Sequence, residues 1–413
     1  MAKFDVAVLG AGIVGICSAI HLQRAGLSVA LVDRREPGME TSFGNAGIIQ
    51  REGVHPYLFP RNVITLARHA LNRGTEAHYH LSALAHVAPF LFRYWRASRP
   101  DKARATLAAN IPLFAECLSS HGELADAAGA GNLIAKNGWL RLLRDDSAMS
   151  AAEAELAELC ELGLVSTLLA KPDLAQLEPH LRTDGLAGAV HHADPWTVSD
   201  PGALVSAYAA LFEKEGGTVV CANAFDLSRE AGGSWFSGVE LQADRIVVAL
   251  GPWSEPFLDK LGVKLPMGIK RGYHRHYRGA DGATLTRSVV DDANGFVLAP
   301  MRAGIRLTSG AEFARLDAPP TPVQLERALP KARQLLALGE PVEEEPWMGA
   351  RPAFPDMRPV IGSAPGRGDV WINTGHAHHG FTLGPASGRL LSQMMTGGEP
   401  LCDPAPFSAA RFG

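Results

Sequence analysis

The sequence predicts an α/β protein, α+β overall, in which two domains are interleaved. Residues 4–9 form an apolar run that leads into a glycine turn, an amphipathic stretch at 13–25 and a second apolar run at 28–32, the β-turn-α-turn-β opening of a parallel sheet. Residues 266–312 contain several strand-like runs separated by glycines, a pattern typical of an antiparallel sheet. At 413 residues the chain is also longer than one hydrophobic core usually supports.

The middle of the chain is predicted to be largely helical. Residues 81–97 and roughly 101–130 show a helical pattern, with Pro89 as an interruption, and 148–160 is alanine-rich. A second α/β signature follows, in which Asp200 and Pro201 open a helix that runs to about Lys214. Gly216 and Gly217 end this helix, and a strand is expected at 218–222.

The remaining elements complete both predicted sheets. Residues 223–243 suggest a hairpin, and 245–250 a buried strand that ends at Gly251. A helical pattern returns near 321–339. The tail alternates a strand at 370–373, a glycine-rich turn and a helix at 382–395.

Composition excludes several classes of protein. The formal net charge is −4 with no block of like charges, which argues against a nucleic-acid surface. No run of about 18 apolar residues is present to span a membrane. The five scattered cysteines predict reduced thiols in the cytoplasm and no zinc site, and the strand pattern close behind Met1 predicts no secretory signal.

The first turn carries a dinucleotide-binding fingerprint of the Rossmann type. Gly10, Gly12 and Gly15 stand in GxGxxG spacing between strand and helix, around Ile13 and Val14. These glycines permit a tight turn, close approach of a pyrophosphate and packing of the helix on the strand. Asp33 follows Gly15 by 18 residues, where a carboxylate accepts hydrogen bonds from ribose hydroxyls. Because only one such fingerprint is present, either NAD is the sole cofactor or FAD is bound here and reduced directly by substrate.

Three further segments carry a family resemblance. They are TSFGNAG at 41–47, VALGPWS at 248–254, and NTGHAHHGFTLGP at 373–385. In this order and spacing they resemble the D-amino acid oxidase-like superfamily of flavoproteins, most of all its bacterial D-amino acid dehydrogenase and D-hydroxyproline dehydrogenase branch. His379 and Phe381 depart from the residues that many relatives carry at these positions.

The resemblance implies FAD as the cofactor and a discontinuous FAD-binding domain at 1–80, 195–265 and 345–413. The substrate-binding domain would comprise 81–194 and 266–344. The residues expected to contact FAD are Gly10, Gly12, Ile13, Val14, Gly15, Asp33, Arg34, Arg35, Thr41, Ser42, Asn45, Ala46, Gly47, Gly251, Trp253, Gly375, His378, Gly380, Phe381 and Thr382.

The resemblance also points to residues that handle the substrate. Arg351, in WMGARP, resembles the arginine that binds a substrate carboxylate, and a planar guanidinium suits that role. Tyr273 resembles a tyrosine at the edge of the substrate sheet, although a half-buried strand tyrosine explains it equally well. His379 is the third candidate catalytic residue. No metal site is expected, because His376, His378 and His379 lie in a glycine-rich turn without the spacing of metal ligands.

The implied reaction is FAD-dependent oxidation of a small amino acid, a D-amino acid or a proline- or hydroxyproline-like one, by hydride transfer from Cα. The alternatives are a sarcosine- or glycine-type oxidase that uses O₂, and a non-catalytic FAD-binding scaffold. The resemblance leaves a quinone or an electron-carrier protein open as acceptor. Helix 81–97 is either a core helix or a peripheral contact with the inner face of the membrane.

Overall fold

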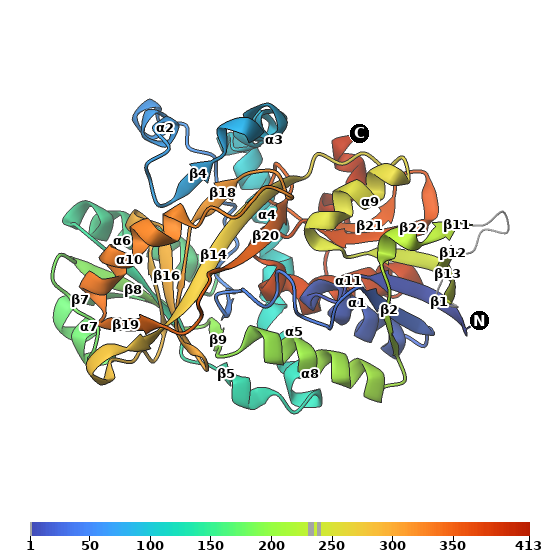
Figure 1. Ribbon diagram of the computed structural model, residues 1–413, viewed down its shortest axis with the longest axis horizontal. Coiled ribbons are helices and arrows are strands. Elements are labelled where there is room, and N and C mark those ends of the chain that lie inside the picture. The colour runs from blue at the N-terminus through green and yellow to red at the C-terminus, as the bar shows by residue number, and fades with distance from the viewer. Residues whose placement is uncertain (1, 230–234, 238–240) are drawn as a thin grey trace.

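The computed structural model describes residues 2–229, 235–237 and 241–413, and it contains two lobes side by side (Figure 1). One lobe is built on a sheet whose central strands are parallel, in the order β10 (Thr218–Cys221), β2 (Val29–Asp33), β1 (Ala2–Leu9), β13 (Leu241–Val248) and β22 (Arg367–Thr374). Antiparallel strands complete it: β21 (Val360–Ala364) beside β22, and β12 (Trp235–Ser237) and β11 (Ser228–Arg229) beyond β13. The predicted parallel sheet is confirmed.

Helices cover both faces of this sheet. On one face α1 (Ile13–Arg24) packs against α11 (Gly380–Thr396) and α8 (Pro201–Lys214). A Cβ atom at Gly388 of α11 would lie 2.7 Å from the Cys17 carbonyl carbon, so the missing side chain lets these helices approach closely. The other face packs on α9 (Ser254–Lys260). The packing of α1 on α11 places the beginning and the end of the chain next to each other.

The second lobe contains an 11-stranded, mainly antiparallel sheet, as predicted. Its path is β4 (Ala77–Tyr79), β18 (Ala311–Phe313), β14 (Gly268–Gly279), β17 (Gly304–Thr308), β16 (Phe296–Met301), β15 (Ser288–Asp291), β6 (Trp139–Leu143), β8 (Gly188–His192) and β7 (Ser166–Ala170). The strands β19 (Leu338–Pro341) and β20 (Trp347–Ala353) pair with β14 off this path. The helices α6 (Asp146–Glu161), α7 (Lys171–Leu177) and α10 (Val323–Leu335) pack on this lobe.

Short elements join the lobes. A three-stranded sheet contains β3 (Ile48–Ile49), β9 (Trp196–Val198) and β5 (Ile134–Ala135). The helices α4 (Pro100–Ala115) and α5 (Cys117–Ala127) pack against α11 of the first lobe. The helices α2 (Val63–Ala70) and α3 (Leu84–Ala97) lie at the upper edge of the molecule (Figure 1). Single-turn 3₁₀ helices are η1 (Leu81–Ala83), η2 (Gly131–Leu133), η3 (Ala224–Asp226), η4 (Gly251–Trp253), η5 (Ala280–Gly282), η6 (Asp292–Asn294), η7 (Ala405–Phe407) and η8 (Ala409–Phe412).

The predicted helices and strands are found in order, and the domain boundaries stay a prediction. Strand pairing differs from the predicted domain boundaries at two segments. The strands β4 and β20 fall in the predicted FAD-binding domain but pair in the sheet of the second lobe. Leu113 and Leu124, on α4 and α5, pack in the core beside α1 and α11, although 81–194 was assigned to the second domain. The turn of the 223–243 hairpin lies outside the described residues. None of the helices described is long and apolar enough to cross a bilayer.

Candidate active site

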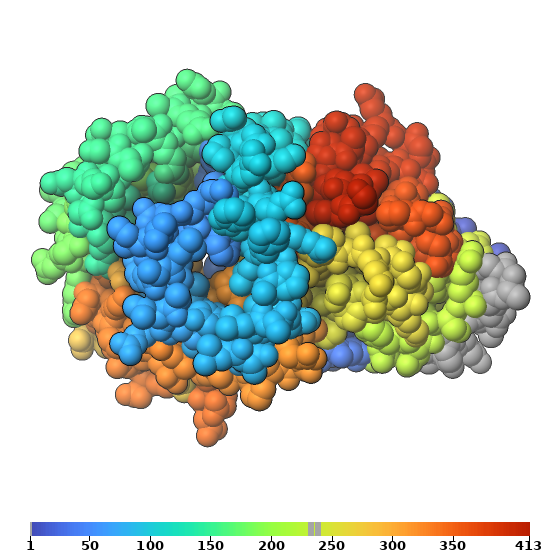
Figure 2. Space-filling view, turned by 90° about the horizontal axis from the view of Figure 1, so that it is seen from above, coloured from blue at the N-terminus to red at the C-terminus, as the bar shows by residue number. Residues whose placement is uncertain are grey.

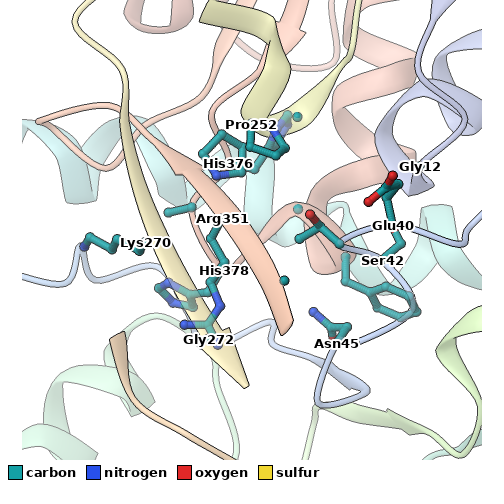
Figure 3. A pocket seen from close by; sticks show the side chains of 18 of the residues that line it. Gly12, Glu40, Ser42, Asn45, Pro252, Lys270, Gly272, Arg351, His376 and His378 are labelled. Carbon is teal, nitrogen blue, oxygen red and sulfur yellow. The ribbon is translucent and has the colours of Figure 1, made fainter. Parts of the chain in front are cut away.

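A cavity of about 560 Å³ lies between the two sheets. Its lining combines the first glycine turn, the loop after β2, the end of β13, strands β14 and β20, and the start of α11. Figure 3 shows Gly12, Glu40 and Ser42 on one side of this cavity and Lys270, Arg351 and His378 on the other. The cavity therefore joins the predicted dinucleotide turn to the predicted substrate residues.

The glycine turn has the geometry of a diphosphate site. Gly10 has φ +103°, and a Cβ there would lie 2.5 Å from the Ala249 carbonyl oxygen. A Cβ at Gly15 would lie 1.8 Å from the Gly10 oxygen, so this glycine holds the helix against the strand without lining the cavity. Gly12 precedes α1 without a side-chain cap, and the N–H groups of Gly12 and Val14 donate to no group in the described chain. Free N–H groups at a helix N-terminus are the donors that phosphate oxygens need.

The far end of the cavity follows β2. The Asp33 carboxylate accepts from the backbone N–H of Ala11 at 2.7 Å and of Arg35 at 3.1 Å, and it also lines the cavity. The Arg34 guanidinium lies 4.7 Å from the centre of the Trp253 ring, whereas Arg35 is exposed and does not line the cavity. Sequence reasoning missed further lining residues at this end, namely Glu40, Asn223, Ala224, Phe225, Leu250 and Pro252. Leu250 and Pro252 flank Gly251 in the VALGPWS segment, which was the available signal for them, whereas 223–225 reach the cavity only through the fold.

The loop after β2 is tied to both lobes. Thr41 donates its hydroxyl to the Ala350 carbonyl at 2.8 Å, and Ser42 Oγ accepts from the Ile13 N–H at 3.0 Å. Asn45 Oδ1 accepts from the Gly47 N–H at 2.8 Å, so Gly47 supports the loop although it does not line the cavity. Thr41, Ser42, Asn45 and Ala46 do line it. The loop thus presents small side chains and backbone to the cavity, as close approach of a flat ring requires.

The start of α11 closes the same region. Gly375 has φ +81°, and a Cβ there would lie 2.2 Å from the Phe354 ring. The N–H groups of Gly380 and Phe381, which both line the cavity, have no acceptor among the residues described. Thr382 points elsewhere: its hydroxyl accepts from the Gln50 N–H at 3.1 Å. The positive end of a 17-residue helix therefore faces the cavity and favours negative charge there.

The three histidines of this turn have three different surroundings. His376 Nε2 lies 3.1 Å from Ser387 Oγ in the protein interior. His378 lines the cavity, and its buried Nε2 has no partner in the part of the chain described. His379 does not line the cavity and instead packs edge-on against Phe114, with ring centres 4.9 Å apart. The position of His379 therefore does not support the expectation that it acts on substrate. His378, and not His379, faces the cavity.

Burial lowers the pKa of all three rings. For His376 and His379 the pKa falls to about 3, and for His378 it falls well below the ordinary value of 6.5. Arg351 and Lys270 lower the pKa of His378 further by repulsion. All three rings are therefore neutral at pH 7, and they do not converge as ligands of one metal ion.

Two cations face each other at the substrate end of the cavity. Lys270 on β14 and Arg351 on β20 are directly opposite in the antiparallel register, so their side chains leave the same face of the sheet. Neither forms an ion pair with a carboxylate of the described residues. The Lys270 amine lies 4.4 Å from the centre of the Tyr94 ring and 3.6 Å from the Met357 sulfur. Like charges in this arrangement repel, so the pair favours an anion between them.

Desolvation acts on both cations. It lowers the pKa of Lys270 to about 7, with Arg351 contributing repulsion, and it lowers the pKa of Arg351 from its ordinary value. The Arg351 guanidinium lies against Gly272, where a Cβ would be only 2.6 Å from Nη2. Gly272 therefore makes the room for this side chain. Sequence reasoning named Arg351 and did not name Lys270.

Tyr273 does not offer its hydroxyl to the cavity. Although the residue contributes to the lining, its hydroxyl donates to Glu312 Oε2 at 2.8 Å and accepts from Arg271 and from the Thr321 N–H, each at 2.8 Å. Side chains alternate along a strand, so Lys270 and Gly272 face one way while Arg271 and Tyr273 face the core. The Tyr273 side chain is buried, and protein groups already occupy its hydroxyl, so its position does not support the expectation that it binds substrate. Tyr57 is one of several aromatic residues that line the cavity, and its ring centre lies 4.2 Å from that of His378.

A separate cluster brings potential metal ligands together. Ligand atoms of His78, His80 and Glu312 lie within 4.8 Å of one another. The Glu312 carboxylate, however, is 2.6 Å from Arg271 Nε and also accepts from Tyr273 and Thr321. These protein groups already neutralise and satisfy the carboxylate, so the cluster is explained as a buried ion-pair network.

Comparison with known proteins agrees with this geometry. Residues 5–394 match the protein family described as DAO, FAD dependent oxidoreductase. The chain is 29% identical to a D-amino-acid oxidase of Bradyrhizobium diazoefficiens over 98% of both chains, and 29% identical to a D-amino acid dehydrogenase of Chromohalobacter salexigens over 99% of both. Among solved structures, glycine oxidase from Geobacillus kaustophilus is similar, with a TM-score of 0.75 at 21% identity over 100% of this chain and 99% of that one.

Proposed function

The chain belongs to the FAD dependent oxidoreductase family of the DAO type, and from this premise we propose that it oxidises the Cα–N bond of a small amino acid. D-amino acids are the preferred class, including proline- and hydroxyproline-like ones, because both curated relatives carry names of enzymes that act on D-amino acids. The product is an imine, which hydrolyses to a 2-oxo acid and ammonia or persists as a cyclic imine when the substrate is proline-like.

FAD fits the residues present. The glycine turn and its free N–H groups suit the diphosphate, Asp33 suits a ribose, and the 41–47 loop with the start of α11 suits the ring. When bound, FAD supplies the acceptor for a hydride from the substrate Cα. We assign cofactor contact to those predicted residues that line the cavity, and a supporting role to Gly15, Arg35, Gly47 and Thr382.

The observation that carries the proposal is the uncompensated charge of Arg351. A desolvated guanidinium with no carboxylate partner among the described residues favours an anionic ligand, and its planar fork matches a substrate carboxylate in two parallel hydrogen bonds. Held this way, the carboxylate fixes the Cα in one position within the cavity. No protein base is required at Cα, because the substrate amine loses its proton before the hydride leaves, so activity rises with pH.

Anaerobic mixing tests the reaction class. The FAD-loaded protein is exposed without oxygen to D- and L-amino acids, prolines and N-methyl amino acids, and flavin absorbance is followed. We expect bleaching by D-amino acids or prolines. A flavin that stays oxidised with every compound would contradict the proposal and favour the non-catalytic scaffold.

The electron acceptor separates the leading proposal from its nearest alternative. We propose a quinone or an electron-carrier protein as acceptor, with a cytoplasmic location and no more than peripheral membrane contact. The similarity to a D-amino acid dehydrogenase supports this choice, whereas the similarity to glycine oxidase favours O₂. Reoxidation by a soluble quinone much faster than by air supports the dehydrogenase, and rapid peroxide formation in air supports the oxidase.

A further inference from the structure

Helix α3 has two apolar stripes, one on its buried side and one on its exposed side, whereas a surface helix normally has only the buried one. Val87, Phe90 and Tyr94 point into the protein and are buried. On the other side, Leu81 in η1 and Leu84, Phe92 and Trp95 in α3 are spaced so that they share one helical face, and all four are exposed. Leu81 is 74% exposed and Phe92 is 59% exposed. A second stripe of this kind has no role in the core of this chain.

Helix α2 has no buried side chain at all. Val63 and Ile64 begin it and are 78% and 80% exposed, and Leu71 after its end is exposed as well. The Asn62 side chain caps the helix N-terminus by accepting from the Ile64 N–H at 2.8 Å, so the helix is terminated properly without being packed. Exposed apolar side chains gathered on one helix in this way mark an interaction surface.

The two helices lie on the same side of the molecule. Figure 1 shows α2 and α3 together at one edge, and the view onto that edge in Figure 2 shows residues 60–97 as one continuous face. Arg61 links them, because its guanidinium lies 4.7 Å from the Trp95 ring centre and donates to the Trp95 carbonyl at 2.9 Å. We call the exposed residues of this region the α2–α3 face: Arg61, Val63, Ile64, Arg68, Leu71, Arg73, Leu81, Leu84, Phe92, Arg93, Trp95 and Arg96.

The charge of this region is opposite to that of the whole chain. Residues 58–104 carry eight lysine and arginine side chains and two carboxylates, whereas the chain has a formal net charge of −4. Arg93 and Arg96 flank the apolar stripe of α3 and form no ion pair with any described residue. Exposed aliphatic and aromatic side chains surrounded by arginines suit the boundary between lipid headgroups and acyl chains, where arginines keep their charge in the headgroup layer.

We propose that the α2–α3 face binds the surface of an anionic lipid bilayer. The apolar side chains enter the upper part of the acyl layer, and the arginines contact lipid phosphates. Binding to the bilayer does not depend on the proposed reaction. The use of a lipid-dissolved electron acceptor, which binding would favour, rests on the proposed function. Leu58, just before α2, lines the cavity and is exposed, so the bound protein holds the mouth of the cavity near an acceptor dissolved in lipid.

Co-sedimentation with vesicles tests the proposal on the FAD-loaded full chain. One set of vesicles contains phosphatidylcholine with phosphatidylglycerol, and the other contains phosphatidylcholine alone. We expect binding to the anionic set only, with loss at high salt because the arginine contribution is screened. Ile64→Asp removes apolar contact and adds a negative charge, and it is expected to lower the partition coefficient about tenfold or more. Arg93→Glu is expected to lower it by a similar factor on anionic vesicles.

Val165→Asp is the matched control, since Val165 is 58% exposed in the turn before β7 and outside the α2–α3 face. It is expected to bind like the unmodified protein, and amino-acid-dependent flavin bleaching is expected to be unchanged in all three variants. Equal binding to both vesicle sets, no binding to either, or an equal loss in Val165→Asp would overturn the proposal. A stable dimer in solution that Ile64→Asp dissociates would also overturn it and assign the face to a second copy of the chain.

Discussion

Replacing Arg351 by methionine is the most direct test of the proposed substrate site. Methionine keeps most of the length of the side chain and removes its charge, and Gly272 leaves the space beside it open. Arg351 has no carboxylate partner among the residues described, so the change breaks no internal ion pair. Fold and FAD content should therefore be retained, and the effect should fall on the substrate carboxylate.

The size of the effect follows from the two hydrogen bonds that are lost. Hydrogen bonds to charged groups contribute about 1.5–3 kcal/mol each, and the nearby Lys270 charge offsets part of the loss. A net loss of about 2–3 kcal/mol corresponds to roughly 30- to 150-fold in kcat/KM. Most of it should appear as a higher KM, because the carboxylate is bound equally before and during hydride loss.

The loss should also depend on pH, because Lys270 has a pKa of about 7. The lysine is protonated below this value and neutral above it. Arg351→Met also removes the repulsion from Arg351, which raises the pKa of Lys270 in the variant. At pH 6 the protonated lysine still attracts the carboxylate, and the variant should be impaired more severely at pH 9, where a larger share of Lys270 is neutral.

Steady-state kinetics with a soluble acceptor at both pH values measures these effects, and Arg278→Met on the exposed end of β14 is the matched control. Arg351→Lys should recover only part of the loss, since an ammonium does not form the bidentate pair. Kinetics of Arg351→Met equal to those of the unmodified protein, at unchanged FAD content, would refute the assignment.

Three further predictions concern the cofactor turn and the buried titratable groups. Gly15→Val should abolish FAD retention, measured by flavin absorbance after gel filtration, because a Cβ there lies 1.8 Å from the Gly10 oxygen; a yellow variant would contradict this. Lys270→Met should be more stable than the unmodified protein near pH 7, and thermal unfolding should show the difference shrinking by roughly 1–3 kcal/mol toward pH 9. The sign follows because the folded-state pKa of Lys270, about 7, lies below the ordinary 10.5, so the unfolded chain binds more protons over this interval and stability rises with pH. His379→Phe should keep turnover within about twofold, because the ring packs on Phe114 outside the cavity, and a large loss of turnover would restore His379 as a catalytic candidate. Since the folded-state pKa of His379 is about 3, below the ordinary 6.5, this variant should also lose less stability than the unmodified protein as the pH falls below 6.5.

Local patterns predicted much of the fold. The glycines of the first turn, the apolar runs beside them and the helix signals at Asp200 and Gly216 depend on neighbours in sequence, and the structure contains the corresponding elements at those positions. The dinucleotide turn was predictable for the same reason, because a tight turn before a helix is specified within a few residues.

The side-chain assignments around the substrate end were harder to predict. Lys270, Arg271 and Tyr273 lie within four residues on one strand, and a shift of one position decides whether a side chain faces cavity or core. Nothing in the sequence of β14 says which face is covered by the core helices. Arg271 is fully buried against Glu312 while Lys270 lines the cavity, and sequence reasoning singled out neither residue.

By itself, the amino-acid sequence determined the predicted helices, the strands around the first turn and the phosphate-binding turn, but it did not reveal the strands between residues 134 and 198. These depend on backbone preferences and spacing, which act over short distances along the chain. Only the tertiary structure decided that Lys270 stands opposite Arg351, that the Tyr273 hydroxyl is bound by Glu312 and Arg271, that His379 packs outside the cavity, and that the apolar side chains of α2 stay exposed. The reason is that each of these facts is a contact, or the absence of one, between segments far apart in the chain, and long-range packing settles such contacts after local preferences are satisfied.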